Sequence, residues 1–592
     1  MQIAQYIHQL RGWLSTLQRK HALILLSIAV GMGAGLIAVV LKNAVFGMRK
    51  LLTNWFTLDE VNWLYALYPA LGIALTWFII RLFLNGKHPG PGIPTTLYAI
   101  SKRGGQMKRQ QMYASVITSV FTVGFGGSAG LEAPAVQSTA GLGSNLAALF
   151  HQNYKTRILL IGCAAAGSLA AMFKAPVAAI VFAVEVIMID LTTASMVPLL
   201  MASLSALLTA SLFLDDDALL SIHDAEPFSF KYLPLYILLG VACGVFSGYF
   251  NRIYLSVTGF FQRIKNPLLR IGSGGILLGA IVLVFPPLYG EGYDILNAFL
   301  RDDIRESTAN SMFYDLPVDG WWILLFIFGL LIIKVLATGI TLGAGGVGGI
   351  FAPSLFMGGT LGFLFARLID KLNITEALPI GSFTLVGMAG LMAGVLHAPL
   401  TSIFLIAEIS GGYELFVPLM ISAAIAYYTS RLFSKHTIYT RELSERGELI
   451  THDKDQTVLT LMNLRNEIET NFKPIGSRAT LGELVKVVSV SQRNLFPVLA
   501  DDARLVGVVS LDDIREIMFR QELYADVKVA ELMTQPPAII RLGDRMEEVV
   551  RKFDESGAWN LPVVDDHGIY AGFVSKSRIF SVYRQVLVDV SV

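Results

Sequence analysis

The stretch Gly130-Leu131-Glu132-Ala133-Pro134 places one carboxylate between a glycine and a proline, within a long apolar region rich in small residues. Later in the chain, Gly349-Ile350-Phe351-Ala352-Pro353 has the same Gly-x-x-x-Pro frame. An ionisable side chain at bilayer depth is costly, so its presence indicates a functional site. Paired apolar segments interrupted by Gly and Pro are typical of the binding site in a membrane transport protein built from repeats.

The composition is that of a membrane protein with a soluble tail. Of the 592 residues, 54% are hydrophobic and 15% are charged, whereas soluble domains carry about 25% charged residues. The apolar runs fill residues 1–440, and the remainder reads as an ordinary soluble protein. A net charge of +1 with no basic face argues against nucleic acid as a partner. Two cysteines in apolar runs form neither a disulfide framework nor a metal-ligand spacing.

Two kinds of apolar run predict a polytopic α-helical fold. Runs long enough to cross a bilayer (about 20 residues) lie near 22–41, 63–84, 194–214, 232–257, 271–289 and 321–342. Shorter runs, or runs broken by Gly or Pro, lie near 112–124, 131–149, 158–188, 350–369, 380–396 and 399–433. Broken backbone inside a membrane is tolerated only where it is buried in protein or lines a wet cavity. We therefore expect a thick helical assembly with an internal ion or substrate path.

An internal repeat relates the two halves of the apolar region. Ala175–Glu185 aligns with Ala398–Glu408, and in both segments a glutamate falls nine residues after the proline. This match predicts an internal duplication. Because Glu408 is the repeat mate of Glu185, we expect a structural role for both, such as capping or buried pairing.

Basic loops predict the orientation in the membrane. They contain Lys102, Arg103, Lys108 and Arg109, then Arg252, Arg263, Lys265 and Arg270, and finally Arg431, Lys435, Arg441 and Arg446. The segment 212–230 has no Lys or Arg but contains the acidic run Asp215–Asp217. We expect both termini in the cytoplasm, although Lys42, Arg49 and Lys50 do not fit this orientation.

The soluble tail contains a second repeat. Asn494–Leu499 recurs as Asn560–Val564, and Gly507–Ser510 recurs as Gly572–Ser575. Each copy reads as helix, strand, turn, strand and helix, a unit too small to bury much core alone. We therefore expect two α/β units that pack as a pair. The predicted division is 1–440 for the membrane domain, 441–525 for the linker and first unit, and 526–592 for the second unit.

The Gly/Pro segments have the composition of an anion site. Conduction needs weak binding at several sites, and helix N-termini offer partial positive charge and free N–H groups without a fixed cation. The segments Gly90–Pro94, Gly130–Pro134 and Gly349–Pro353 contain no Lys or Arg. A cation path would instead need converging carboxylates or carbonyls, and these segments supply one acid.

These three segments and Tyr439 occur in the order and contexts of the CLC chloride channel/transporter family, which residues 20–440 resemble. The tail similarly resembles a tandem CBS pair (a Bateman module). The resemblance implies a homodimer with one anion pathway per subunit and a membrane domain of two inverted halves, followed by a cytoplasmic α/β CBS pair.

The same resemblance assigns roles to individual residues. Glu132 would be the gating glutamate, which fills an anion site when ionised and leaves it when protonated or displaced. The backbone amides of Ile350 and Phe351 would bind the central anion, and the Tyr439 hydroxyl would reach it from the cytoplasmic side. The full expected anion-binding set is Pro91, Gly92, Ile93, Gly130, Ile350, Phe351 and Tyr439.

Two departures from the family pattern bear on mechanism. Pro91 stands where the family usually has serine. The proline removes a hydroxyl and a backbone N–H donor from the expected anion site. Proline at this position resembles the plant nitrate-accumulating members, so the preference between chloride and nitrate stays open. Family exchangers commonly carry two consecutive glutamates after the Ala-Pro helix, and the second accepts protons from inside. Here the pair reads Glu185-Val186, and valine at this proton-path position resembles the channel branch.

The tail offers one candidate nucleotide site. CBS pairs often bind adenine nucleotides through a Ser/Thr-x-x-Asp signature, and the first copy retains Ser510 and Asp513. The second copy has Arg578 at the acid position. At most one standard site is expected, and a dimerisation module without ligand is the alternative.

We therefore expect a gated chloride channel in a bacterial inner membrane, with inorganic anions, lipid and a second copy as partners and no required cofactor. The alternative is a proton-coupled anion exchanger. A further alternative is a membrane sensor that transports nothing. A divalent-cation channel would need acidic rings, and an intramembrane enzyme would need catalytic partners for His151 or His397; the sequence offers neither.

Overall fold

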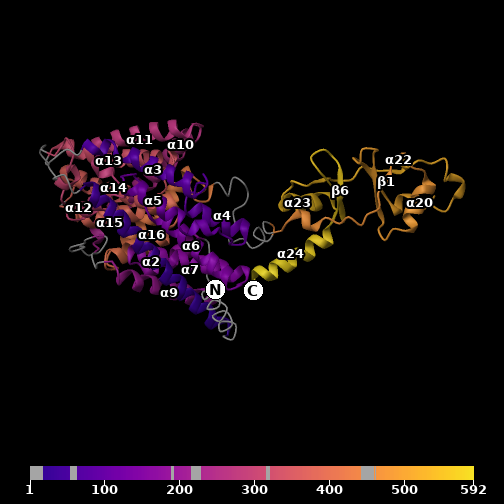
Figure 1. The fold of residues 1–592 in the computed structure, drawn as a ribbon, viewed down its shortest axis with the longest axis horizontal. Coiled ribbons are helices and arrows are strands. Elements are labelled where there is room, and N and C mark those ends of the chain that lie inside the picture. The colour runs from indigo at the N-terminus through magenta and orange to yellow at the C-terminus, as the bar shows by residue number, and fades with distance from the viewer. Residues whose placement is uncertain are drawn as a thin grey trace. The chain divides into compact units, whose positions relative to one another are not determined.

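The computed structural model describes residues 18–53, 63–187, 192–214, 220, 228–314, 320–375, 377–441, 459 and 462–591. The chain divides into two compact units, Met1–Leu449 and Ile450–Val592 (Figure 1). The acidic run Asp215–Asp217, the basic residue Arg446 and the chain's N-terminal residues lie outside the described ranges.

The first unit is helical, as the apolar runs predict. Its helices are α2 (Arg19–Thr53), α3 (Tyr68–Phe83), α4 (Ile93–Arg103), α5 (Ala114–Gly124), α6 (Glu132–Leu149), α7 (Tyr154–Phe173), α8 (Pro176–Glu185), α9 (Thr193–Ser211), α10 (Leu233–Gln262), α11 (Pro267–Val284), α12 (Tyr293–Leu300), α13 (Trp321–Gly343), α14 (Phe351–Lys371), α15 (Ile380–Leu396), α16 (Pro399–Ile409) and α17 (Phe416–Phe433). Eight of the described helices are long and apolar enough to cross a membrane, and several others are short and apolar.

The two halves repeat the same helix break. The chain leaves α7 through Lys174 (φ +55°) and leaves α15 through His397 (φ +53°), both in the left-handed conformation. An Ala-Pro step follows each, and the proline opens α8 or α16. Proline suits a first helical turn because its missing N–H would have no intrahelical partner there.

Glu185 and Glu408 cap each other's helices across the two halves. The Glu185 carboxylate accepts hydrogen bonds from Leu400 N (3.2 Å) and Thr401 N (2.7 Å) at the start of α16. The Glu408 carboxylate accepts hydrogen bonds from the backbone N–H groups at the start of α8, at 3.0 and 2.8 Å. A carboxylate at a helix N-terminus satisfies free donors and faces the positive end of the helix dipole. The structural role expected from the repeat is therefore seen in both glutamates.

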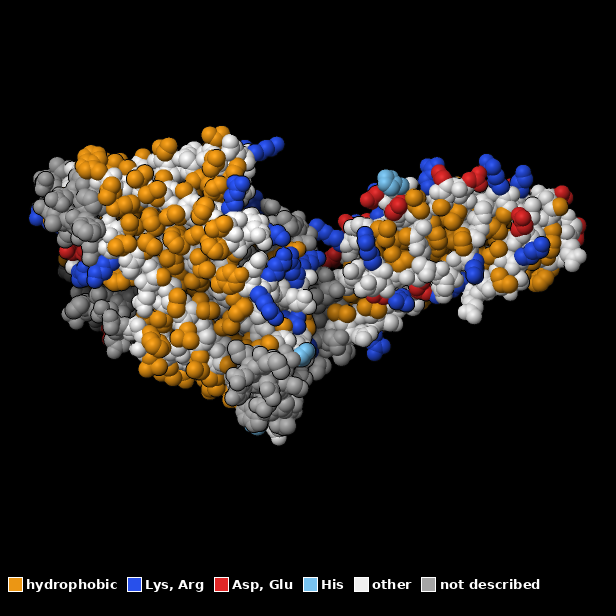
Figure 2. All heavy atoms as spheres, viewed as in Figure 1, with side chains coloured by type: hydrophobic (Ala, Val, Ile, Leu, Met, Phe, Trp, Pro, Cys, Tyr) orange, Lys and Arg blue, Asp and Glu red, His pale blue; other side chains and the backbone are white. Residues whose placement is uncertain are grey.

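Small residues allow the central helices to lie close together. A Cβ on Gly387 of α15 would lie 2.4 Å from the Gly358 carbonyl oxygen of α14, so no larger residue fits at this crossing. Outward-facing positions are large and apolar instead, as at Leu200, Leu204 and Leu208 of α9. Figure 2 shows hydrophobic side chains spread over the visible face of this unit. Such a surface is matched to lipid rather than water.

The second unit contains two copies of one α/β motif. The strands of the first copy are β1 (Ile475–Gly476), β2 (Leu495–Leu499) and β3 (Leu505–Ser510), and those of the second are β4 (Ile540–Arg541), β5 (Asn560–Val564) and β6 (Tyr570–Ser575). In each sheet the first strand pairs parallel to the second, which pairs antiparallel to the third. The accompanying helices are α20 (Leu481–Ser489), α21 (Leu511–Ile514), α22 (Val529–Leu532), α23 (Met546–Ser556) and α24 (Lys576–Ser591).

The two copies pack as a pair, as their small size predicts. Arg504 and Ile569 form an isolated β-bridge between the copies. The Phe472 and Phe573 rings lie 4.5 Å apart. Phe472, Val508 and Phe573 form a small buried cluster between the copies, which adds to the limited core that each small copy has.

Candidate functional site

The two Gly-x-x-x-Pro frames meet at the centre of the membrane unit. Gly130 N donates to the Gly349 carbonyl (2.9 Å), and Gly349 N donates to the Gly130 carbonyl (2.8 Å). This bridge places the N-termini of α6 and α14 side by side. The start of α4 joins them, because a Cβ on Gly92 (φ +79°) would lie 2.7 Å from the Ala133 Cβ. Three helix starts from distant parts of the sequence therefore converge, and helix N-termini are suited to binding anions.

Glu132 lies at this convergence and is 1% exposed. One carboxylate oxygen, Oε1, accepts a hydrogen bond from the Tyr293 hydroxyl at 2.8 Å. The other, Oε2, makes no hydrogen bond of ordinary geometry within the described part of the chain, but the Ala352 N–H at the start of α14 acts on the carboxylate. A Cβ on Gly130 would lie 2.2 Å from Oε2 and 3.1 Å from Ala352 N, in the first turn of α14. The carboxylate thus fills the space in front of the α14 N-terminus, where a free anion would also be stabilised.

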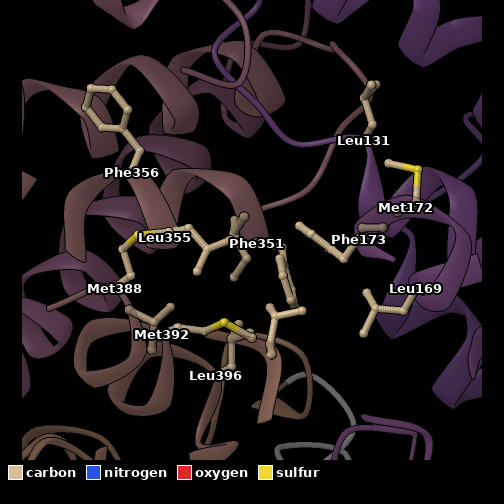
Figure 3. Close-up of a cluster of buried hydrophobic side chains, with 14 of the residues drawn as sticks. Leu131, Leu169, Met172, Phe173, Phe351, Leu355, Phe356, Met388, Met392 and Leu396 are labelled. Atoms are coloured by element: carbon tan, nitrogen blue, oxygen red, sulfur yellow. The ribbon is translucent and has the colours of Figure 1, made fainter. Parts of the chain in front are cut away.

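Phe351 contributes its ring to the core and its backbone to the site. Its side chain is fully buried, and its ring centroid lies 5.4 Å from that of Phe173 and 6.4 Å from that of Phe182. Figure 3 shows Phe351 facing Phe173 from α7 within a cluster of apolar side chains. Because the ring is fixed on several sides, the first backbone N–H groups of α14 are held in place.

A cavity of about 610 Å³ is lined by three of the expected anion-binding residues. Pro91, Ile350 and Tyr439 line it, and the buried Tyr439 hydroxyl has no hydrogen-bond partner among the described residues. Gly92 and Ile93 form the buried start of α4 and do not line the cavity. Arg270 and Arg441 also line it. Sequence reasoning assigned these two arginines only to basic loops, although they give the cavity positive charge.

A smaller cavity of about 190 Å³ lies beside the proton-path position. Glu185, Val186 and His397 line it, together with Arg431 and Tyr439 among others. Tyr439 therefore borders both cavities. The Glu185 carboxylate already accepts hydrogen bonds from two backbone N–H groups at the start of α16. It also accepts a hydrogen bond from the Thr401 hydroxyl at 2.7 Å.

Sequence reasoning missed the residues that surround Glu132 from other elements. Glu291 accepts a hydrogen bond from Leu131 N through Oε1 at 3.2 Å. Lys334, fully buried on α13, donates to the carbonyl oxygens of Gly290 (3.1 Å) and Glu291 (3.3 Å). The sequence did contain a sign of this group, because Lys334 lies inside an apolar run long enough to cross a membrane. A charged side chain in such a run seldom lacks a function.

The tail residues singled out for nucleotide binding cap a helix. Ser510 N donates to Asp513 Oδ2 (2.8 Å), and Asp513 N donates to Ser510 Oγ (3.2 Å), a reciprocal capping box. In the second copy Arg578 takes the acid's place, and its Nε donates to Glu467 at 3.1 Å. Within the described ranges, no group of three His, Cys, Asp or Glu side chains is placed to hold a metal.

Comparisons with known proteins agree with this architecture. The family model described as "Voltage gated chloride channel" matches residues 71–431, and the CBS domain model matches residues 466–520 and 529–585. The Escherichia coli protein named voltage-gated ClC-type chloride channel ClcB is 28% identical over 435 residues, covering 70% of this chain and 98% of that protein. The Vibrio cholerae H(+)/Cl(−) exchange transporter ClcA is 27% identical over 437 residues, covering 71% and 89%.

A solved structure has the same fold. The structure titled a slow cyanobacterial Cl−/H+ antiporter superimposes with a TM-score of 0.62 at 24% identity, covering 73% of this chain and 98% of that one. The family model spans more than half of the chain, and the apolar helices make it an integral membrane protein. The chain therefore belongs to the CLC family of voltage gated chloride channels and transporters, and it carries a pair of CBS domains after its membrane unit.

Proposed function

We propose that this protein exchanges chloride, or a related inorganic anion such as nitrate, for protons, with Glu132 as the gate that carries the proton. The observation that carries the proposal is the position of the Glu132 carboxylate, buried in front of the α14 N-terminus, where the Ala352 N–H acts on it. An ionised carboxylate and a free anion compete for this place. Protonation removes the charge that holds the carboxylate there, so proton uptake and anion entry are linked.

The remaining residues give the anion a route that binds it weakly. Arg270 and Arg441 line the larger cavity and attract anions toward it. Beyond them, the Tyr439 hydroxyl and the backbone N–H groups of Ile350 and Phe351 supply donors without a fixed cation. Pro91 supplies no N–H at the start of α4, which weakens any strict preference for chloride.

A gated channel is the second candidate, and Val186 is the observation that favours it. Valine cannot accept a proton, so an exchanger must deliver protons to Glu132 by water. The 190 Å³ cavity lined by Glu185, Val186 and Tyr439 is large enough for water and supports delivery as far as Tyr439. Similarity to a relative named an exchange transporter also supports exchange. The expectation of a channel from the sequence rested on Val186 alone.

The test uses the full chain reconstituted in liposomes with a chloride gradient and a membrane potential clamped by potassium and valinomycin. Exchange predicts that chloride flow drives protons against their gradient, seen as a pH change in a weakly buffered bath. Glu132→Gln should keep anion flux and lose proton movement. Chloride flux without proton movement in the wild type would establish the channel, and absence of both fluxes would indicate a sensor that transports nothing.

Assembly, location and the tail's ligand are part of the same proposal. We expect two copies to form a homodimer in a bacterial inner membrane, with both termini and the CBS pair in the cytoplasm. We assign residues 1–440 to the membrane domain, 441–525 to the linker and first CBS motif, and 526–592 to the second CBS motif. An adenine nucleotide would bind in the first CBS copy, where Asp513 would meet the ribose.

A further inference from the structure

The segment Gly290–Tyr293 contacts the gate and lines neither of the two cavities. Tyr293 is the first residue of α12, and its hydroxyl donates to Glu132 Oε1 at 2.8 Å. The Tyr293 ring lies 6.5 Å from the Phe173 ring in an edge-on arrangement. The hydroxyl is therefore directed at the carboxylate by a ring that packs against the core.

Buried contacts fix this segment in place. Glu291 accepts from Leu131 N, the backbone group directly before Glu132. The Lys334 ammonium donates to the carbonyls of Gly290 and Glu291 and lies 4.7 Å from the centre of the Phe356 ring. These bonds tie the backbone before Tyr293 to α13, and they tie the backbone before Glu132 to the Glu291 side chain. The backbone that carries the Tyr293 donor is therefore held by contacts that do not involve the Glu132 side chain.

Gly292 allows the sharp turn between Glu291 and Tyr293. Its φ is +93°, and a Cβ there would lie 2.4 Å from Phe356 Cδ2. Only glycine adopts such a conformation without strain. The turn is thus specified by the sequence Gly290-Glu291-Gly292-Tyr293 and by its packing on α14.

We propose that Tyr293 is a positioning residue that latches the ionised Glu132 carboxylate in the anion site. This inference rests on the proposed gating role of Glu132. A hydroxyl donor stabilises a carboxylate more than a neutral acid, so the latch favours the ionised, closed gate and must break when Glu132 leaves. Glu132 is faced by the ammonium of Lys42 on α2, by the Glu291 carboxyl and by the Tyr439 hydroxyl. Lys334 on α13 acts on Glu291. The ammonium of Lys42 also donates to the Met172 carbonyl.

Tyr293→Phe tests the latch by removing one oxygen atom. The readout is anion flux as a function of external pH in liposomes that contain the full chain. Without the donor, Glu132 takes up a proton at higher pH, so the midpoint of activation should rise by about one pH unit, a tenfold change in proton concentration. Tyr289→Phe is the matched control, because the Tyr289 hydroxyl donates to the Gly124 carbonyl (2.9 Å) and does not contact Glu132. Its midpoint should stay at the wild-type value.

Two further variants separate this inference from the proposed function. In a Glu132→Gln background, Tyr293→Phe should have no effect on the pH profile, since the latch then has no carboxylate to hold. Site-specific 3-fluorotyrosine at position 293, a stronger donor, should lower the midpoint; this substitution also serves if the phenylalanine variant does not fold. Coincident profiles for Tyr293→Phe and the wild type would overturn the latch and leave exchange intact. A wild type that moves no protons would instead overturn the proposed function.

Discussion

Replacing Glu185 by glutamine should lower the thermal stability of the protein and leave proton movement coupled to chloride movement. The carboxylate accepts hydrogen bonds from Leu400 N, Thr401 N and the Thr401 hydroxyl. All three donors point at one charged group at the start of α16. To take up a proton, Glu185 would have to give up this charge-assisted arrangement. We therefore expect it to act as a cap, although it borders the cavity beside Val186.

The size of the effect follows from the hydrogen bonds that glutamine cannot make. Glutamine keeps one acceptor oxygen and turns an NH2 group toward a donor. A hydrogen bond to a charged group contributes about 1.5–3 kcal/mol and a neutral one about 0.5–1.5 kcal/mol, and the charge–dipole interaction adds up to about 2 kcal/mol. A loss of about 2 kcal/mol corresponds to a denaturation temperature lower by a few degrees. Glu408→Gln removes the equivalent cap from α8 and should cost about the same.

The assay combines thermal denaturation in detergent with the liposome measurement of proton and chloride flux. Because membrane proteins often denature irreversibly, all variants are heated at one scan rate. The expected result is a similar fall in denaturation temperature for Glu185→Gln and Glu408→Gln, with the ratio of protons to chloride unchanged in both. Loss of proton movement in Glu185→Gln, with normal stability and with Glu408→Gln unaffected, would refute the capping argument and make Glu185 the inner proton acceptor.

Three further predictions concern the gate, the anion preference and the tail. Gly130→Ala places a Cβ 2.2 Å from Glu132 Oε2, so it should displace the carboxylate and raise anion flux while lowering the number of protons moved per chloride; unchanged stoichiometry would contradict this. Pro91→Ser restores an N–H and a hydroxyl at the larger cavity, and reversal potentials under mixed anions should shift toward chloride over nitrate. Asp513→Ala should reduce ATP binding to the full chain at least tenfold in calorimetry, whereas equal binding by variant and wild type would place the nucleotide elsewhere.

Much of the helical framework could be predicted from hydrophobicity and from Gly and Pro. The apolar run near 321–342 becomes α13, Trp321–Gly343, and the run near 380–396 becomes α15, Ile380–Leu396. The broken run near 399–433 divides into α16 and α17. Proline explains the starts of α8 and α16, since it fits a first turn and not a helix interior.

Short helices escaped prediction because they carry too little periodic signal. The helix α12, Tyr293–Leu300, has 8 residues, and no apolar run of bilayer length marks it. Its position nevertheless decides the environment of the gate, because Tyr293 lies at its start. The first span was also underestimated: the run near 22–41 belongs to α2, Arg19–Thr53, of 35 residues. Lys42 lies inside this helix, and not in a loop after it, which explains its poor fit to the basic-loop pattern.

The sequence alone determines where helices start and where along them the acids lie. The Gly-x-x-x-Pro frames and the Ala-Pro steps are local, so they specify free N–H groups and the positions of Glu132, Glu185 and Glu408 along the chain. Only the tertiary structure decides which helix start each carboxylate meets. Glu185 and Glu408 cap each other's helices across the two halves, and Glu132 meets a tyrosine 161 residues away. Such pairings depend on long-range packing of small residues, for which local propensity and periodicity carry no information.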